Sequence, residues 1–127
     1  MALEYTITPE PALISVTVEG LPDYLSIDKL WHDIVAACNQ HQCFDILGTS
    51  NLEPAPSGEA YSHAAIFEAA GVHNGFRIAW VEENPATKEW IKLSEAVVRN
   101  RNLATARAFD NLEDAKRWLT DRAATRV

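Results

Sequence analysis

The chain has 127 residues, of which 47% are hydrophobic and 23% are charged, a balance typical of a globular protein with one domain. No segment approaches the ~20 consecutive apolar residues that a membrane helix needs, and the N-terminus lacks the basic and apolar regions of a secretion signal. We therefore expect a cytoplasmic protein with no membrane span. A formal net charge of −7 argues against nucleic acid as a partner, because Lys and Arg must neutralise its phosphates.

The charges are unevenly distributed along the chain. Residues 1–97 carry a net charge of −10, whereas residues 98–127 carry +3. The sequence therefore predicts a basic C-terminal element on an acidic body. Two interpretations stay open: a solvated helix whose charges complement the rest of the domain, or a docking surface for an acidic partner.

The first part of the chain predicts two strands and a helix. Alternating polar and apolar residues at 5–8 and 13–18 are typical of half-buried strands, and their short connection implies an antiparallel pair. A helix follows, capped by Ser26 and ending near Gln42, with apolar side chains at steps of three and four residues. The residues expected to face inward are Leu30, Ile34, Ala37, Cys38 and His41.

The middle of the chain predicts a strand, a long loop and a second helix. Residues 44–47 form a compact strand that Gly48 closes, and residues 49–58, rich in Ser, Pro and Asn, form the loop. The helix begins near Glu59, and Gly71 suits the left-handed position that ends it. Its expected inward residues are Ile66, Ala69 and Ala70.

The last part predicts two further strand and helix pairs. The apolar run 76–81 is typical of a strand covered on both faces, and Asn84-Pro85 opens the next helix. A last strand at 104–109 leads into a helix with a capping box of Asp110 and Glu113. The residues expected to face inward on these two helices are Trp90, Leu93, Val97 and Val98, then Leu112, Ala115, Trp118 and Leu119.

The order of elements is therefore β-β-α-β-α-β-α-β-α. Strands separated by helices run parallel through right-handed crossovers, so the sheet is mixed and mostly parallel, with the antiparallel first strand at or near an edge. The sequence contains no internal repeat or linker, which predicts a single α/β domain over residues 1–127.

This order, together with the segment 106–119 (Ala-Arg-Ala-Phe-Asp-Asn-Leu-Glu-Asp-Ala-Lys-Arg-Trp-Leu), resembles the STAS-like family, in its SpoIIAA-like branch related to anti-sigma factor antagonists. In that branch the last strand ends in Phe, here Phe109. The last helix carries an Ala followed three residues later by Trp-Leu, here Ala115 and Trp118-Leu119. The resemblance implies a non-enzymatic binding or regulatory module without a cofactor, whose partner is a protein or, in some relatives, a small or amphipathic ligand.

In the true antagonists a phosphorylatable Ser lies in an Asp-Ser-Ser-Gly or similar motif at the start of the second helix. Here the Ser-Gly pair is Ser57-Gly58, without an adjacent Asp. Ser57 and Ser62 lie where the loop meets the helix N-terminus, whose free N–H groups and dipole favour a negative charge. Both are candidates for phosphorylation or anion binding, and the alternative for each is a plain helix cap.

A ligand or partner surface is expected beyond the C-terminal ends of the parallel strands. A pocket of roughly several hundred Å3 there would favour a carrier of a small apolar or lipid-like ligand, and a flat patch would favour a protein partner. Its candidate residues are Thr49, Ser50, Asn51, Gly58 and Tyr61.

Tyr24, Leu25 and Trp31 form a second candidate surface at the start of the first helix. An exposed apolar rim there would suit a partner helix, a second copy of the chain in a homodimer, or an apolar ligand. The alternative is that the loop at residues 20–26 covers Trp31 and leaves an ordinary helix flank.

Two other kinds of site are not expected. Cys38, His41 and Cys43 have the chemistry of zinc ligands but lack a fourth, so we expect no metal. Ser62 and His63 are adjacent, yet consecutive side chains on a helix point about 100° apart and do not make a catalytic pair. A small hydrolase is therefore only a further alternative to the binding module.

Overall fold

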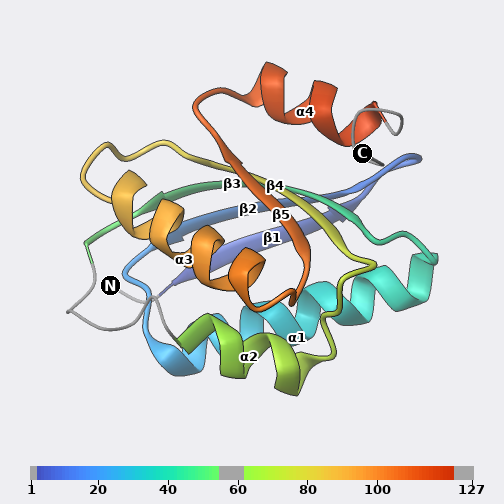
Figure 1. The fold of residues 1–127 in the computed structure, drawn as a ribbon, viewed down its shortest axis with the longest axis horizontal. Coiled ribbons are helices and arrows are strands. Elements are labelled where there is room, and N and C mark those ends of the chain that lie inside the picture. Colours follow the sequence, from blue (N-terminus) through green and yellow to red (C-terminus); the bar gives the residue numbers. More distant parts are fainter. Residues whose placement is uncertain (1–2, 55–61, 122–127) are drawn as a thin grey trace.

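The computed structural model describes residues 3–54 and 62–121, and for residues 62–64 it describes the backbone only. The predicted order of strands and helices is confirmed (Figure 1). The elements are β1 (Glu4–Pro9), β2 (Ile14–Gly20), α1 (Tyr24–His41), β3 (Asp45–Leu52), α2 (Ser62–Ala70), β4 (Arg77–Glu82), α3 (Lys88–Asn100), β5 (Thr105–Phe109) and α4 (Leu112–Thr120).

The strands form one five-stranded sheet in the order β1-β2-β3-β4-β5. β1 pairs antiparallel with β2 at the edge, as predicted, and the other neighbours are parallel. Because each crossover steps to the next strand in the same direction with the same hand, α1, α2 and α3 all lie on one face of the sheet. Of the helices that the structure describes, α4 alone covers the other face (Figure 1).

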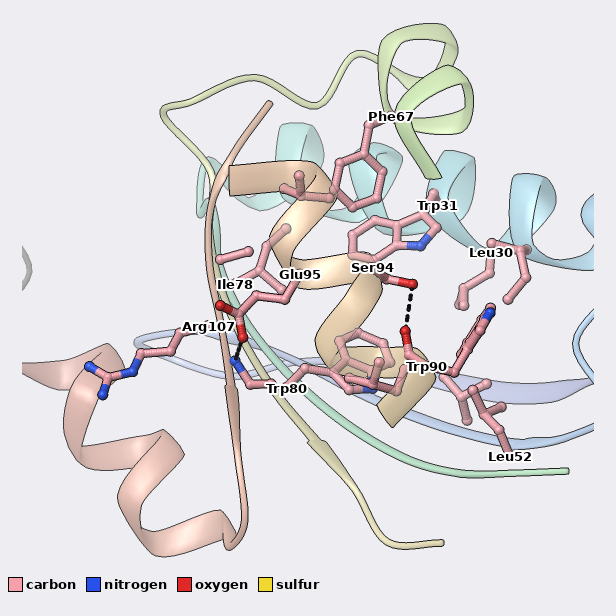
Figure 2. A pocket seen from close by; sticks show the side chains of 16 residues that line it. Leu30, Trp31, Leu52, Phe67, Ile78, Trp80, Trp90, Ser94, Glu95 and Arg107 are labelled. Carbon is pink, nitrogen blue, oxygen red and sulfur yellow. Dashed lines mark hydrogen bonds between the residues drawn. The ribbon is translucent and has the colours of Figure 1, made fainter. Parts of the chain in front are cut away.

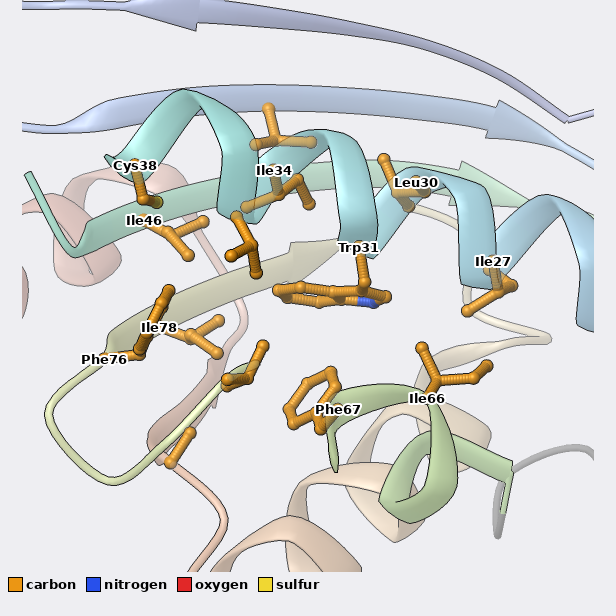
Figure 3. Close-up of a cluster of buried hydrophobic side chains, with 14 of the residues drawn as sticks. Ile27, Leu30, Trp31, Ile34, Cys38, Ile46, Ile66, Phe67, Phe76 and Ile78 are labelled. Carbon is orange, nitrogen blue, oxygen red and sulfur yellow. The ribbon is translucent and has the colours of Figure 1, made fainter. Parts of the chain in front are cut away.

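The main core lies between the sheet and the three helices on its first face (Figure 3). Successive strand residues point to opposite faces, so Ile14, Val16 and Val18 of β2 all enter this core. Trp31 of α1 lies at its centre, 4.5 Å between ring centroids from Phe67 of α2 in an edge-to-face arrangement. Aromatic contacts therefore join α1 to α2 across the core.

A smaller core lies under α4, where Ala115 and Leu119 are buried against the sheet. Arg77 of β4 holds the end of this helix in place. Its guanidinium donates to the carboxylate of Asp45 at 3.0 Å and to the carbonyl of Leu119 at 2.7 Å, and it stacks over the half-buried ring of Trp118. A cation at the last carbonyls of a helix also complements the helix dipole.

The beginning of α1 differs from the prediction. Asp23, three residues before the predicted cap Ser26, is the N-cap, and its carboxylate accepts the backbone N–H of Ser26 at 2.9 Å. At the other end Gln42 adopts the left-handed conformation with φ 51, and His41, predicted to face inward, is exposed. The inward positions were otherwise predicted well because Leu30, Ile34 and Cys38 follow the helical period; the buried residues are Ile27, Leu30, Trp31, Ile34, Val35 and Cys38.

The later helices also differ from the prediction, either in where they begin or in which side chains they bury. For α2, Gly71 has φ 93 and ends the helix as predicted, but Phe67 is buried and Ala69 is exposed. The start predicted near Glu59 lies outside the described residues. For α3, the helix begins at Lys88, and Leu93, predicted to face inward, is 43% exposed.

The last helix packs against the sheet as predicted, but a different residue caps it. Asn111 is the N-cap of α4 and accepts the backbone N–H of Asp114 at 2.8 Å, so the predicted box of Asp110 and Glu113 is wrong. Leu112, predicted to face inward, is 45% exposed: it lies on the same side of the helix as Ala115 and Leu119, but as the first helical residue it is only partly covered. No helix in the described ranges is long and apolar enough to cross a membrane.

Candidate functional site

The predicted loop after Gly48 is wrong over its first residues, because β3 continues to Leu52. β2 and β4 flank this stretch and pair with it on both sides, with Thr49 opposite Thr17 and Val81. Alternation then places Thr49 and Asn51 on the α4 face, and Ser50 on the three-helix face. Ser50 is 1% exposed, so it is a buried group rather than part of a surface loop.

Ser50 belongs to a buried polar network at the carboxyl ends of β3 and β4. Its hydroxyl donates to the carboxyl group of Glu82 at 2.6 Å and accepts the indole N–H of Trp80 at 2.8 Å. Glu82 is 2% exposed, and its second oxygen accepts the backbone N–H groups of Leu52 and Asn84, both at 3.0 Å. Three donors therefore satisfy a carboxyl group that would otherwise be costly to bury.

The same network fixes the start of α3. The carbonyl of Leu52 accepts the side-chain amide of Asn84 at 2.7 Å and the hydroxyl of Thr87 at 2.6 Å. Asn84 therefore bridges back to β3 and holds a turn through its contact with Ala86, and Thr87 becomes the N-cap. This is why the helix predicted to open at Asn84-Pro85 begins three residues later.

Gly48 makes room for the indole of Trp80. The two residues are paired across β3 and β4, and a Cβ on Gly48 would overlap the six-membered ring of that indole. The ring can lie flat across the neighbouring strand only because residue 48 has no side chain. Its N–H then reaches Ser50, and its face reaches Trp31, with 5.9 Å between the ring centroids.

A small cavity lies beside these rings, between α3, α1 and the sheet (Figure 2). Its volume is about 70 Å³, and its walls are almost entirely apolar. Among its lining residues are three tryptophans, Trp31, Trp80 and Trp90. The volume is well below the roughly 300–1,000 Å3 of sites for drug-sized ligands, so the cavity lacks room for a lipid-like ligand.

Two polar side chains at the cavity, Ser94 and Glu95, are engaged by the protein itself. The hydroxyl of Ser94 donates to the carbonyl of Trp90 at 3.0 Å, and the carboxylate of Glu95 accepts the backbone N–H of Ala108 at 2.9 Å. Glu95 also pairs with Arg99 on the same helix. These groups are consequently already satisfied where they lie.

The second candidate surface is only partly formed as predicted. Tyr24 and Leu25 are 44% and 77% exposed, but Trp31 is 4% exposed and lines the cavity. Trp31 lies one position off the predicted stripe of α1, yet Phe67 of α2 and Trp80 of β4 cover it. The predicted alternative, a covered Trp31, therefore agrees with the structure, and Phe67 and Trp80 are two of the side chains that cover it.

Several predicted site residues have no described side chain. Ser57, Gly58 and Tyr61 lie outside the described residues. Ser62 begins α2, and only its backbone is described. Phosphorylation of Ser57 or Ser62 therefore stays a prediction.

The described charges favour the first interpretation of the basic C-terminal element. Arg99 pairs with Glu95, and Arg117 pairs with Glu113 at 2.9 Å, each one helical turn away on its own helix. Such pairs are typical of solvated helix surfaces.

The two cysteines are reduced thiols. Burial, chiefly, raises the pKa of Cys38 to about 12, with smaller contributions from Cys43 and Asp45. Among the side chains described, those of residues 3–54 and 65–121, no group of three or more His, Cys, Asp or Glu gathers in a way that could hold a metal ion.

Sequence comparison with known proteins finds no match to a family model or to a curated protein. Two solved structures are nevertheless similar. One, an anti-sigma factor antagonist from Mycobacterium paratuberculosis, has a TM-score of 0.66 and 18% identity over 94% of this chain and 96% of that one. The other, an uncharacterized protein with a SpoIIAA-like fold from Shewanella loihica, has a TM-score of 0.58 and 14% identity over 92% and 93%. The chain is therefore a domain with the STAS-type, SpoIIAA-like fold, as its order of elements and its C-terminal segment predict.

Proposed function

We propose that this protein is a non-enzymatic regulatory module of the cytoplasm that acts by binding another protein. The observation that supports this most is the similarity to an anti-sigma factor antagonist, which extends over nearly the whole of both chains. Fold alone is a weak warrant for function, so the proposal also needs a surface on this chain that a partner can contact.

The first turn of α1 provides such a surface, which we call the α1 tip and define as Tyr24 and Leu25. Both side chains are exposed, and Leu25 is the most exposed of the large hydrophobic side chains described, at 77%. The backbone N–H of Glu53 donates to the carbonyl of Gly20 at 2.9 Å, so the end of β3 lies next to the chain that leads into this turn. The α1 tip thus belongs to the edge of the sheet where the parallel strands end, the usual place for binding sites in such folds.

Two matched leucine substitutions test this proposal. Leu25→Asp places a charge in the α1 tip, and Leu112→Asp places one on α4, at a leucine that is 45% exposed on the other side of the sheet. Leu25 is 77% exposed, so Leu25→Asp should keep the wild-type free energy of unfolding within about 0.5 kcal/mol. Leu112 is more than half covered, so Leu112→Asp should be the less stable of the two, and both variants are first shown to be folded.

The assay is affinity purification of the tagged protein from its native cells, followed by identification of the protein that co-purifies in near-equal amount. We expect wild type and Leu112→Asp to retain the same partner and Leu25→Asp to lose most of it. Co-purification of a second copy of this chain would make the α1 tip a homodimer interface instead. Equal recovery with both variants, or no partner with wild type, would contradict the proposal.

A further inference from the structure

The cavity under α3 exists because small residues occupy the positions that face it. Ser94 is buried on the inner side of α3, while its neighbour Leu93 points to solvent. Ala106 and Ala108 line the cavity from β5, the strand beneath this helix. A leucine at any of these three positions would occupy much of the space, so the hollow follows from the residues placed there and not from loose packing elsewhere.

The chemistry of the walls restricts what can occupy this space. Indole rings and aliphatic side chains form nearly all of the surface, and the polar side chains of Ser94 and Glu95 are bonded within the protein. The indole N–H of Trp80 likewise donates to the hydroxyl of Ser50. A charged or strongly polar occupant would lose its hydration without replacement, so only an uncharged, apolar molecule complements these walls.

The size of the cavity restricts the occupant further. A water needs about 10–15 Å3 of such space, so the volume of about 70 Å³ corresponds to about five to seven waters. An enclosed apolar cavity of about 150 Å3 takes up benzene, so one ring is the largest occupant that this smaller, partly open cavity can accept. The rings of Trp31 and Trp80 lie 5.9 Å apart at an angle of 36°, within the range in which aromatic rings attract one another.

We propose that this cavity, which we call the indole cavity and define by Trp31, Trp80, Trp90 and Ser94, binds a small uncharged molecule that presents one aromatic ring. The site lies under α3, and although Ile27 of α1 also lines it, Tyr24 and Leu25 do not, so it does not depend on the protein partner proposed above. α3 packs against β5 and α2 and forms one wall of the cavity, which is partly open to solvent.

Titration of the full chain with benzene and, separately, with indole tests the proposal. The readout is the set of backbone and indole N–H signals in 1H–15N NMR spectra. We expect saturable shifts centred on Trp31, Trp80, Trp90 and Ser94, with the rest of the spectrum unchanged. An oleate titration serves as the comparison for a long apolar chain, and it should give no saturable shift at these positions.

Two substitutions on α3 distinguish the effect of filling the cavity from the effect of enlarging any side chain on that helix. Ser94→Leu projects into the cavity, whereas Ala96→Leu makes a similar enlargement outside its lining. We expect at least a tenfold weaker apparent affinity for benzene in Ser94→Leu and an unchanged one in Ala96→Leu. Should Ser94→Leu fail to fold, Ala106→Val supplies the smaller filling substitution and should weaken binding in the same direction.

The proposal is overturned if neither benzene nor indole gives a saturable shift, or if the filled variants bind as well as wild type. Saturable binding of oleate at the same residues would also overturn it, because the size argument would then be wrong. Loss of the protein partner in the purification experiment leaves these outcomes unaffected.

Discussion

Removing the carboxyl group of Glu82 should be among the most destabilising single substitutions in the chain. Glu82→Ala leaves three buried donors without their acceptor: the hydroxyl of Ser50 and the backbone N–H groups of Leu52 and Asn84. Each unsatisfied buried group costs about 1–3 kcal/mol. Because water and small shifts recover part of this, we expect a loss of about 3–5 kcal/mol in the free energy of unfolding.

Glu82→Gln provides the contrast. Its amide oxygen can still accept both backbone N–H groups, and its NH2 group can donate to the Ser50 hydroxyl once that hydroxyl turns. We expect a smaller loss of about 1–2 kcal/mol. The exposed neighbour Glu83 is the control, and Glu83→Ala should change stability by less than about 0.5 kcal/mol.

Urea unfolding followed by tryptophan fluorescence and by far-UV circular dichroism measures all three variants. The reasoning would be refuted if Glu82→Ala cost less than about 1 kcal/mol. It would also be refuted if Glu82→Gln cost as much as Glu82→Ala, because the loss would then not come from missing acceptors. Coincident transitions by the two probes are needed for either comparison.

Three further outcomes follow from single residues. Gly48→Ala should cost about 1–3 kcal/mol in urea unfolding, because its Cβ displaces the ring of Trp80; an unchanged midpoint would contradict the close approach. The pKa of about 12 for the buried Cys38 thiol lies above that of a thiol in the unfolded chain. The contribution of Cys38 to the free energy of unfolding is therefore fully present below about pH 9 and is lost as pH rises toward 12, because the unfolded chain then loses the thiol proton first. The free energy of unfolding of wild type should therefore fall relative to Cys38→Ala over that range, and a thiol reagent should label Cys43 before Cys38 in the folded protein. If the start of α2 is a regulatory site, protein from native cells should carry one phosphoryl group on Ser62, which intact-mass and peptide analysis would detect. A peptide that is unmodified under several growth conditions would contradict that prediction.

Local patterns were enough to predict the order of strands and helices. The alternation in β2 and the helical period of α1 reflect which side chains each element buries on its own, and these patterns need no knowledge of the neighbouring elements. The segment around Ala115 and Leu119 was predicted correctly for the same reason. The wrong caps of α1 and α4 concern a choice between polar residues close in sequence, whereas the larger errors arose where a contact between distant segments decided the outcome.

The end of β3 is the clearest such error. Gly48 and the polar residues after it are typical of a loop, yet β2 and β4 pair with this segment on both sides. Gly48 is present because of the ring of Trp80, thirty-two positions further along the chain, which no local pattern reveals. In the same way, Asn84 bonds to Leu52 and so does not cap α3.

The candidate site was predicted only in part. Two of its residues, Ser50 and Trp31, are buried. The features that the sequence did not predict are the buried carboxyl group of Glu82 and the indole cavity. One signal for Glu82 was available, since alternation along the strand places it on the same face as Ile78 and Trp80. The cavity itself could not be predicted, because it depends on how far α3 lies from the sheet.

The measurement that tests the proposed function most directly is site-specific photo-crosslinking in native cells. A photo-reactive amino acid replaces Leu25 in the α1 tip in one strain and Leu112 on α4 in another. We predict that position 25 forms one dominant adduct with a single other protein, and that position 112 does not. Equal adducts from both positions, or none from position 25 while the protein is folded and abundant, would contradict a partner-binding role for this surface.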